Sequence, residues 1–292
     1  MKMTDYQLFT DATADLSENS MAGLPKVEVI PMEVEICGKE YLFGPGGDIT
    51  TEEFYALQRE GNFASTSQIN PSVYFSSFEP VLRAGKDIIY IGFSSGMSGT
   101  INAARTCAEE LQREFPERKI ICIDSLCASV GEGFLVREAA KKQVEGFGYE
   151  ELVEWVLWNR EKVCHWFTVD VLEHLKHGGR VSSIMAIAGT LVKVKPLLRV
   201  DNSGKLELAG KPRGKISAIK TQISIMKNSW NPRKGKLVII GHGDNIEGAL
   251  KLEQAVQSEF PDAETYISEI GPIIGAHTGP GMLALIYWGA NR

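Results

Sequence analysis

The sequence predicts an α/β protein of two units, an N-terminal parallel sheet with flanking helices and a second α/β domain. Through about residue 145, short apolar segments alternate with helical segments, which is the pattern of a parallel sheet with helices on both faces. Gly146 and Gly148 interrupt this alternation, and the helical and apolar segments that follow are arranged in a different pattern. We place the boundary near residue 160, which gives units 1–160 and 161–292.

The first unit opens with a strand and an extended segment. Residues 6–9 are apolar and run into the polar sequence TDATADLS, as at the end of a strand that feeds a turn. Residues 27–42 are apolar and partly alternating, but Pro31 and the Cys37-Gly38-Lys39 sequence interrupt them. These interruptions favour an edge segment or a hairpin over a helix.

The rest of the first unit alternates between helices and buried strands. Thr50 and Glu53 have the spacing of a capping box, which predicts a helix that extends to about Arg59 and is ended by Gly61. Hydrophobic periodicity predicts two further helices, at 72–83 and 99–115. It also predicts two buried parallel strands, at 87–93 and 119–124.

Glycines and turn residues mark the ends of several helices and strands in the second unit. Gly178-Gly179 ends one helix, and the sequence DNSG at 201–204 has the composition of a hairpin turn between strands 197–200 and 206–208. A helix expected at 149–162 lies at the boundary between the units. In the second unit other helices are expected at 184–192, 216–230 and 245–258, and other strands or apolar runs at 166–170, 236–240, 264–270 and 282–288.

Charge and cysteine content exclude several classes of protein. The chain has 31 Lys+Arg against 37 Asp+Glu and a net charge of -6, a poor match to a phosphate backbone, so we expect no nucleic-acid partner. Its five cysteines lack a CxxC pair and suggest neither a disulfide framework nor a zinc ribbon. Acidic residues precede any apolar run, and no stretch approaches the ~18 apolar residues of a membrane helix. We expect a cytoplasmic protein with reduced thiols.

The sequence GFSSGMSGT, residues 92–100, lies between a predicted buried strand and a predicted helix. Its glycines allow close backbone approach, and hydroxyl and free N–H groups at a helix start favour an anion. Residues 92–96 also fit the G-x-S-x-G pattern, in which Ser94 would be a nucleophile partnered by His277 and Asp244. The loop therefore predicts an anion site, with a serine hydrolase as the alternative.

Two other segments are candidates for binding. Residues 65–68 (STSQ) form a polar loop between two helical segments, and His277 lies in a loop rich in glycine and proline at 271–281. His174 and His177 stand three apart, but no carboxylate or thiol completes a ligand set, so we expect no metal. No complete dinucleotide fingerprint or Walker sequence occurs, and we expect no cofactor.

Seven short motifs together resemble those of the DegV family, in order and spacing, over nearly the whole chain. They are DATADL (11–16), TSQ (66–68), SSGMSGT (94–100), DS (124–125), LKHGGR (175–180), KPLL (195–198) and GAHTGPG (275–281). The resemblance implies a bacterial fatty-acid-binding protein of two α/β domains with the acyl chain buried between or beneath them. It further implies a partner, an ATP-dependent fatty acid kinase catalytic subunit that converts the presented carboxylate to an acyl phosphate for phospholipid synthesis.

The same resemblance implies a protein without catalytic turnover of its own, with transient membrane contact as a further expectation. By position it assigns the carboxylate-binding hydroxyls to Thr66 and Ser95, with His277 completing the hydrogen-bond network and the Gly96 backbone nearby. Neutral hydroxyls and one histidine can hold a carboxylate without a fixed cation, which leaves an oxygen able to attack a phosphoryl donor.

Ser67 and Ser98 belong to the same two motifs and join the expected ligand-binding set. Arg213 also joins it, because it lies where the family often has a basic residue near the ligand head group. Arg180, in the Gly-Gly-Arg segment, is expected to serve partner docking or domain packing instead.

The chain departs from the family pattern at two positions. Ala12 stands where the family usually has serine, which we expect to cost little, and Ile69 replaces a proline, which we expect to alter the loop above the head group and the preferred lipid. Candidate linings of the acyl tunnel are 184–192 and the segments near Phe93, Met97 and 273–274.

Overall fold

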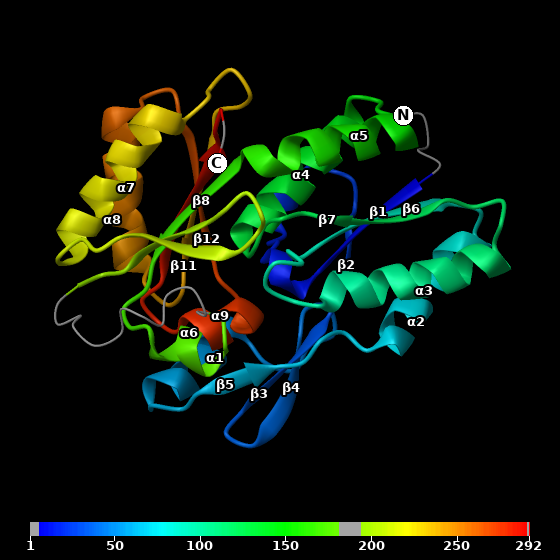
Figure 1. Ribbon diagram of the computed structural model, residues 1–292, viewed down its shortest axis with the longest axis horizontal. Helices are drawn as coiled ribbons and strands as arrows, with labels where there is room; N and C mark the ends of the chain where they lie inside the picture. Colours follow the sequence, from blue (N-terminus) through cyan, green and yellow to red (C-terminus); the bar gives the residue numbers. More distant parts are fainter. Residues whose placement is uncertain (1–5, 181–193, 291) are drawn as a thin grey trace.

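The computed structural model describes residues 6–180, 194–290 and 292, which form three β-sheets with helices packed around them (Figure 1). The first sheet is entirely parallel, as the buried apolar runs predict. In spatial order its strands are β2 (Glu28–Ile30), β1 (Tyr6–Asp11), β6 (Asp87–Gly92) and β7 (Ile120–Asp124).

Alternate residues of β6 face opposite sides of this sheet. Ile89 and Ile91 belong to one hydrophobic cluster, to which α4 (Val130–Val144) and α5 (Tyr149–Asn159) contribute. Ile88 and Tyr90 belong to a second cluster, formed with α2 (Pro71–Arg83) and α3 (Thr100–Glu114). Helices thus cover both faces, as predicted, although α5 ends before residue 162 and a short 3₁₀ turn, Arg160–Lys162, follows it.

The second sheet has six strands and is mostly antiparallel; its β11–β12 pair is parallel. Helices α7 (Lys215–Ser229) and α8 (Ile246–Glu259) pack on one of its faces (Figure 1). The predicted hairpin is present, and the Asp201 carboxylate accepts hydrogen bonds from the N–H groups of Ser203 and Lys205 in its turn. The strand order is β10 (Leu206–Gly210), β9 (Leu197–Val200), β8 (Val163–Thr168), β13 (Leu283–Trp288), β11 (Leu237–His242) and β12 (Glu264–Glu269).

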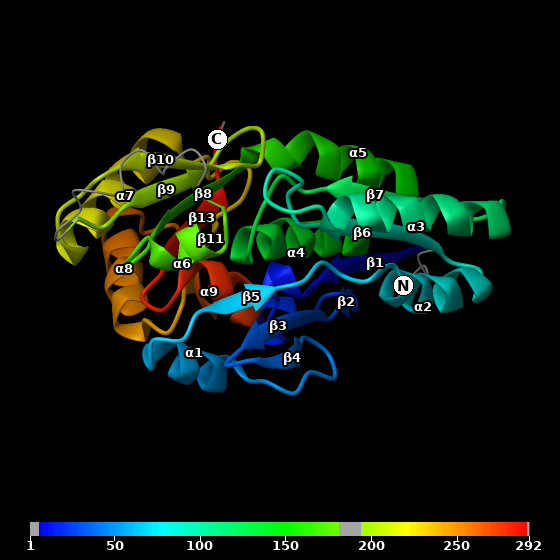
Figure 2. The same ribbon diagram turned by 60° about the horizontal axis from the view of Figure 1, so that its bottom comes forward.

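A small antiparallel sheet lies beside α1 (Thr51–Arg59), which begins with the predicted capping box (Figure 2). Its strands are β4 (Lys39–Phe43), β3 (Met32–Ile36) and β5 (Ala64–Thr66), and β3 and β4 form the predicted hairpin. The polar loop predicted at 65–68 is wrong at its start, because Thr66 pairs with Val34 and ends a strand.

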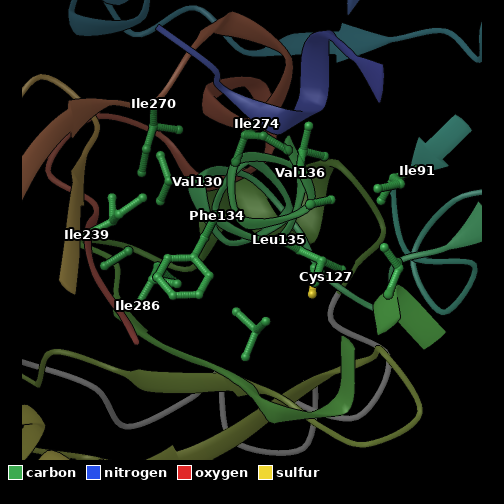
Figure 3. Close-up of a cluster of buried hydrophobic side chains, with 14 of the residues drawn as sticks. Ile91, Cys127, Val130, Phe134, Leu135, Val136, Ile239, Ile270, Ile274 and Ile286 are labelled. Carbon is green, nitrogen blue, oxygen red and sulfur yellow. The ribbon is translucent and has the colours of Figure 1, made fainter. Parts of the chain in front are cut away.

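Helix α4 joins the cores of the two larger sheets. Figure 3 shows Phe134 directed toward Ile239 and Ile286 of the second sheet, and the same cluster extends to Ile91 of the first. Hydrophobic periodicity does not delimit this helix, because its first turns contain glycines with weak helix propensity and its apolar residues are not confined to one face. Since one hydrophobic cluster spans both units, the boundary at residue 160 stays a prediction.

Two short helices, α6 (Glu173–His177) and α9 (Pro272–Thr278), contact each other near the small sheet (Figure 2). The loop predicted at 271–281 is therefore wrong for residues 272–278. Pro272 stands at the first helical position and Gly279 directly after the last, and these are positions that proline and glycine favour. The helical stretch predicted at 184–192 lies outside the described residues. Over the described part of the chain, no helix combines the length and apolar character needed to span a bilayer.

Candidate ligand-binding site

An internal cavity lies between the second sheet, α4 and α9. It contains about 870 Å³ of space free of protein atoms, its open mouth included. Most of the described residues that line it are apolar: Met32, Phe93, Met97, Ala128, Val130, Phe167, Leu175, Val200, Leu206, Ile273, Ile274, Met282, Ala284 and Ile286. The predicted linings Phe93, Met97 and 273–274 are among them.

The cavity runs along β13. Met282, Ala284 and Ile286 line it, and the span from the first to the third is about 13 Å at the usual rise of ~3.3 Å per strand residue. Ile286 pairs with His165 of β8 and Ala284 pairs with Phe167, so both strands present the same face to the cavity. This long and mostly apolar space suits a linear hydrocarbon chain.

A polar cluster lines the cavity at the end nearest α9. It consists of Thr66, Ser67, Gln68, Ser98, Arg180 and His277. Within it, Nε2 of His277 and Oγ1 of Thr66 lie 2.8 Å apart in a hydrogen bond. The Gln68 side chain packs against Gly99, where a Cβ would come within 2.8 Å of its amide nitrogen. This contact brings the segment after β5 against the loop before α3.

Gly178 links His277 to Arg180. A Cβ added at Gly178 would overlap Nδ1 of His277, so only glycine allows the backbone to lie against the imidazole ring. The Gly178 carbonyl in turn accepts a hydrogen bond from the Arg180 guanidinium. Arg180 is half-buried and has no carboxylate partner among the described residues, so its positive charge faces the cavity uncompensated. A carboxylate ligand would complete this arrangement.

The serine-rich loop before α3 turns Ser98 toward the cavity and Ser95 away from it. Ser98 is half-buried and lines the cavity, and its Oγ accepts a hydrogen bond from the Thr100 N–H at 3.2 Å. Ser95 is exposed, because the Asp124 carboxylate holds its backbone N–H at 3.1 Å. Neither Ser95 nor Gly96 is among the described lining residues. Ser98 is therefore the serine of this loop that lines the cavity, and the assignment of a carboxylate-binding hydroxyl to Ser95 stays a prediction.

The structure does not bring together the three residues that the alternative serine hydrolase would need. Ser94 is fully buried, and its Oγ donates to the Gly204 carbonyl at 2.7 Å and accepts from the Gly96 N–H at 3.2 Å. His277 bonds to Thr66 instead of Ser94, and Asp244 forms an exposed ion pair with Arg59. A buried serine without a base has no means of acting as a nucleophile.

The structure places four further residues that the sequence singles out. Arg213 is exposed and does not belong to the described lining, whereas Arg180 lines the cavity as the cation of the polar cluster. The roles expected for these two arginines stay predictions. Ile69 and Ala12 are both buried in the cluster formed with α2 and α3.

Burial keeps the imidazole rings of the cavity neutral. The pKa of His277 is lowered to about 4, mainly by burial and to a smaller extent by the charges of Arg180 and His177. Burial also lowers the pKa of His165 well below its usual range, and its Nδ1 bonds to the Val163 carbonyl at 2.9 Å. His165 is not among the residues expected at the site, because it belongs to no motif; only the alternation of β8 could have placed it on the cavity face. Among the described residues, no three or more His, Cys, Asp or Glu side chains form a group that could hold a metal ion.

Comparison with known families now identifies this arrangement. A family model described as "Uncharacterised protein, DegV family" matches residues 5–289. The chain belongs to the DegV family. A curated DegV domain-containing protein of Clostridium perfringens is 35% identical over 291 residues, which cover 99% of each chain.

Solved DegV structures share the whole fold. "Fatty Acid Binding of a DegV family Protein from Thermus thermophilus" matches with a TM-score of 0.86 and 28% identity, covering 97% of this chain and 99% of that one. "DegV, a fatty acid binding protein from Bacillus subtilis" matches with a TM-score of 0.83 and 26% identity, covering 98% and 99%. The family therefore includes proteins described as fatty acid binding, and the predicted DegV-like α/β fold is confirmed.

Proposed function

We propose that this chain binds a long-chain fatty acid, with the carboxylate at the polar cluster and the acyl chain along β13. The observation that carries the proposal is the shape and chemistry of the cavity. Hydroxyls, a neutral imidazole and a guanidinium gather at one end, and the lining residues from Met282 to Ile286 span about 13 Å along the strand. The fatty acid binding named for the Thermus thermophilus and Bacillus subtilis relatives supports the same ligand class.

The energetics favour a long chain. Removing a CH₂ group from water is worth about 0.8 kcal/mol, so about 14 methylenes contribute roughly 11 kcal/mol before the costs of binding. The Arg180 guanidinium and the hydroxyls of Thr66 and Ser98 add charge-assisted hydrogen bonds to the carboxylate. A ligand of this kind is expected to remain with the protein through purification.

A more specific role follows from the resemblance of the sequence motifs to those of the DegV family. The protein presents the carboxylate to a separate ATP-dependent fatty acid kinase subunit, and a carboxylate oxygen attacks the γ-phosphorus of ATP to give acyl phosphate and ADP. His277 and Ser98 hold the carboxylate while the partner supplies the nucleotide. A cytoplasmic location, where ATP is available, fits this role, and the chain has no turnover of its own.

Mass spectrometry of the protein purified from bacteria tests the binding role. A stoichiometric, non-covalent fatty acid released by denaturation supports it; a protein that stays empty after incubation with palmitate and oleate refutes it. The presenting role is tested with ATP and palmitate. We expect acyl phosphate only when a fatty acid kinase catalytic subunit is added, and acyl phosphate formed by this chain alone would refute that role.

A further inference from the structure

Asp15 connects the starts of two helices that line the cavity. Its Oδ2 accepts a hydrogen bond from the Ser129 hydroxyl at 2.5 Å, and its Oδ1 accepts one from the Gly271 N–H at 2.8 Å. Ser129 is the residue before α4, and Gly271 is the residue before α9. One carboxylate near the N-terminus therefore fixes a helix of the second unit 256 positions away.

Both helices carry cavity residues. Ser129 and Val130, at the start of α4, line the acyl part of the cavity. Helix α9 carries Ile273 in its first turn and His277 in its last, and His277 bonds to Thr66. Any shift of the α9 start is passed along this short helix to the imidazole ring.

The backbone is shaped for this connection. Asp15 and Ser129 both adopt left-handed conformations, with φ of 47° and 54°, which non-glycine residues rarely take. A Cβ at Gly271 would come within 2.8 Å of the Asp15 Oδ1 and 2.5 Å of the Phe43 ring, so only glycine lets the α9 start approach the carboxylate. Two unusual backbone conformations and one glycine without room for a Cβ thus converge on the Asp15 side chain.

We propose that Asp15 is a positioning residue for the ligand head group, which holds the starts of α4 and α9 together and thereby sets His277 against Thr66. This inference rests on the proposed fatty-acid-binding function. Asp15 itself does not touch the ligand, since it is not among the described residues of the cavity wall.

The charge of Asp15 changes near neutral pH. Its pKa is raised to about 7, mainly by burial and to a smaller extent by the charge of Asp11, while the bonds from Ser129 and Gly271 oppose the rise. Above pH 7 the ionised carboxylate accepts both bonds, whereas below pH 7 a proton on one oxygen competes with a donor. The positioning of α9 is therefore firmer above pH 7 than below it.

Other ionisable groups surround Asp15 on each side. Asp11 and Glu132 lie behind it and are themselves buried, with pKa values raised mainly by burial. Tyr55 of α1 faces it, and its pKa is raised above the usual range. In the groove on the open side lie Glu18, Lys26, Tyr266 and Glu269, and Arg137 lies in an adjoining small pocket.

Asp15→Asn tests the proposal, because asparagine keeps the shape but cannot ionise. Affinity for palmitate is measured by calorimetry on delipidated protein between pH 6 and 8.5. Hexadecane sulfonate, which stays ionised, is measured in parallel to exclude titration of the ligand. We expect the wild-type affinity for both probes to fall as the pH drops through 7. At pH 8 the affinity of Asp15→Asn should be about tenfold lower than that of the wild type, as for one lost hydrogen bond to a charged group. The affinity of this variant should not depend on pH.

Glu269→Gln is the matched control, because it removes an exposed carboxylate from the same groove and should keep the wild-type profile. Hydrogen exchange of the α9 amides gives a readout without ligand, and we expect it to quicken in Asp15→Asn. If Asp15→Asn lowers the melting temperature but keeps both the pH profile and slow α9 exchange, Asp15 is merely structural and the inference is overturned. If wild-type protein binds neither probe at any pH, the fatty-acid proposal itself fails.

Discussion

The Nε2 atom of His277 lies 2.8 Å from the Oγ1 atom of Thr66, although 211 positions separate the two residues. Thr66 ends β5 in the small N-terminal sheet, and His277 lies in the last turn of α9. The polar cluster is therefore assembled by tertiary structure and not by one local motif. It follows that changes in either half of the chain reach the same ligand group.

Substitution of two serines in the loop before α3 should have different effects on ligand binding. Ser98→Ala should weaken palmitate binding by about 1–3 kcal/mol, because it removes a hydroxyl that can bond to the carboxylate. Ser95→Ala should leave the affinity unchanged, because this exposed side chain does not line the cavity. Calorimetric titration of the delipidated variants distinguishes them. Loss of affinity in Ser95→Ala alone would support the assignment made from the sequence.

The arginines give a second matched pair. Arg180→Gln should lower the affinity for palmitate by about 1.5–3 kcal/mol, the range for a hydrogen bond to a charged group. Arg213→Gln should bind palmitate as the wild type does, because Arg213 is exposed and outside the described lining. Affinity for hexadecanol, which has no charge, is measured alongside. The assignment fails if Arg180→Gln weakens the alcohol as much as the acid.

Hydrophobic pattern predicts the sheets of this protein well. The runs at 87–93 and 119–124 are apolar apart from the charged residues at their ends because helices bury both faces of β6 and β7, and such runs are typical of parallel strands. The pattern fails where tertiary contacts decide. Thr66 becomes a strand residue because Val34 pairs with it, and α9 forms in a segment whose glycines and prolines suggest a loop.

The candidate site could be predicted as a set of segments but not as a set of side chains. Ser95 and Ser98 are equivalent by composition, and their directions are decided by the Asp124 carboxylate and by the contact of Ser94 with Gly204, 110 positions away. Arg180 enters the site because Gly178 holds it beside His277. Sequence spacing carries no information on such contacts.

The neutral state of His277 predicts a pH dependence of stability. Its pKa is about 4 in the folded protein, so the unfolded chain, with a usual pKa near 6.5, takes up a proton first as the pH falls. Stability should therefore fall between pH 6.5 and 4, by up to roughly 3 kcal/mol from this group. In urea unfolding of the delipidated protein, His277→Gln should show a shallower fall than the wild type. The exposed His177→Gln should lie much closer to the wild type, because the charge of His177 is the smallest of the causes that lower the pKa of His277. Equal slopes in all three proteins would contradict the prediction.

Gly178 offers the sharpest steric test of the polar cluster. A methyl group at this position would overlap Nδ1 of His277, and the backbone φ of -70° is one that alanine adopts without strain. Gly178→Ala should therefore displace the imidazole from Thr66 and weaken palmitate binding by about 1–3 kcal/mol. Gly148→Ala is the control, because its φ is -71° and a Cβ there meets only the Glu151 carboxylate, at 3.5 Å. Both variants should fold, since neither requires a left-handed residue, so circular dichroism and calorimetry together separate local displacement from unfolding. Wild-type affinity in a folded Gly178→Ala protein would show that the position of His277 does not govern ligand binding.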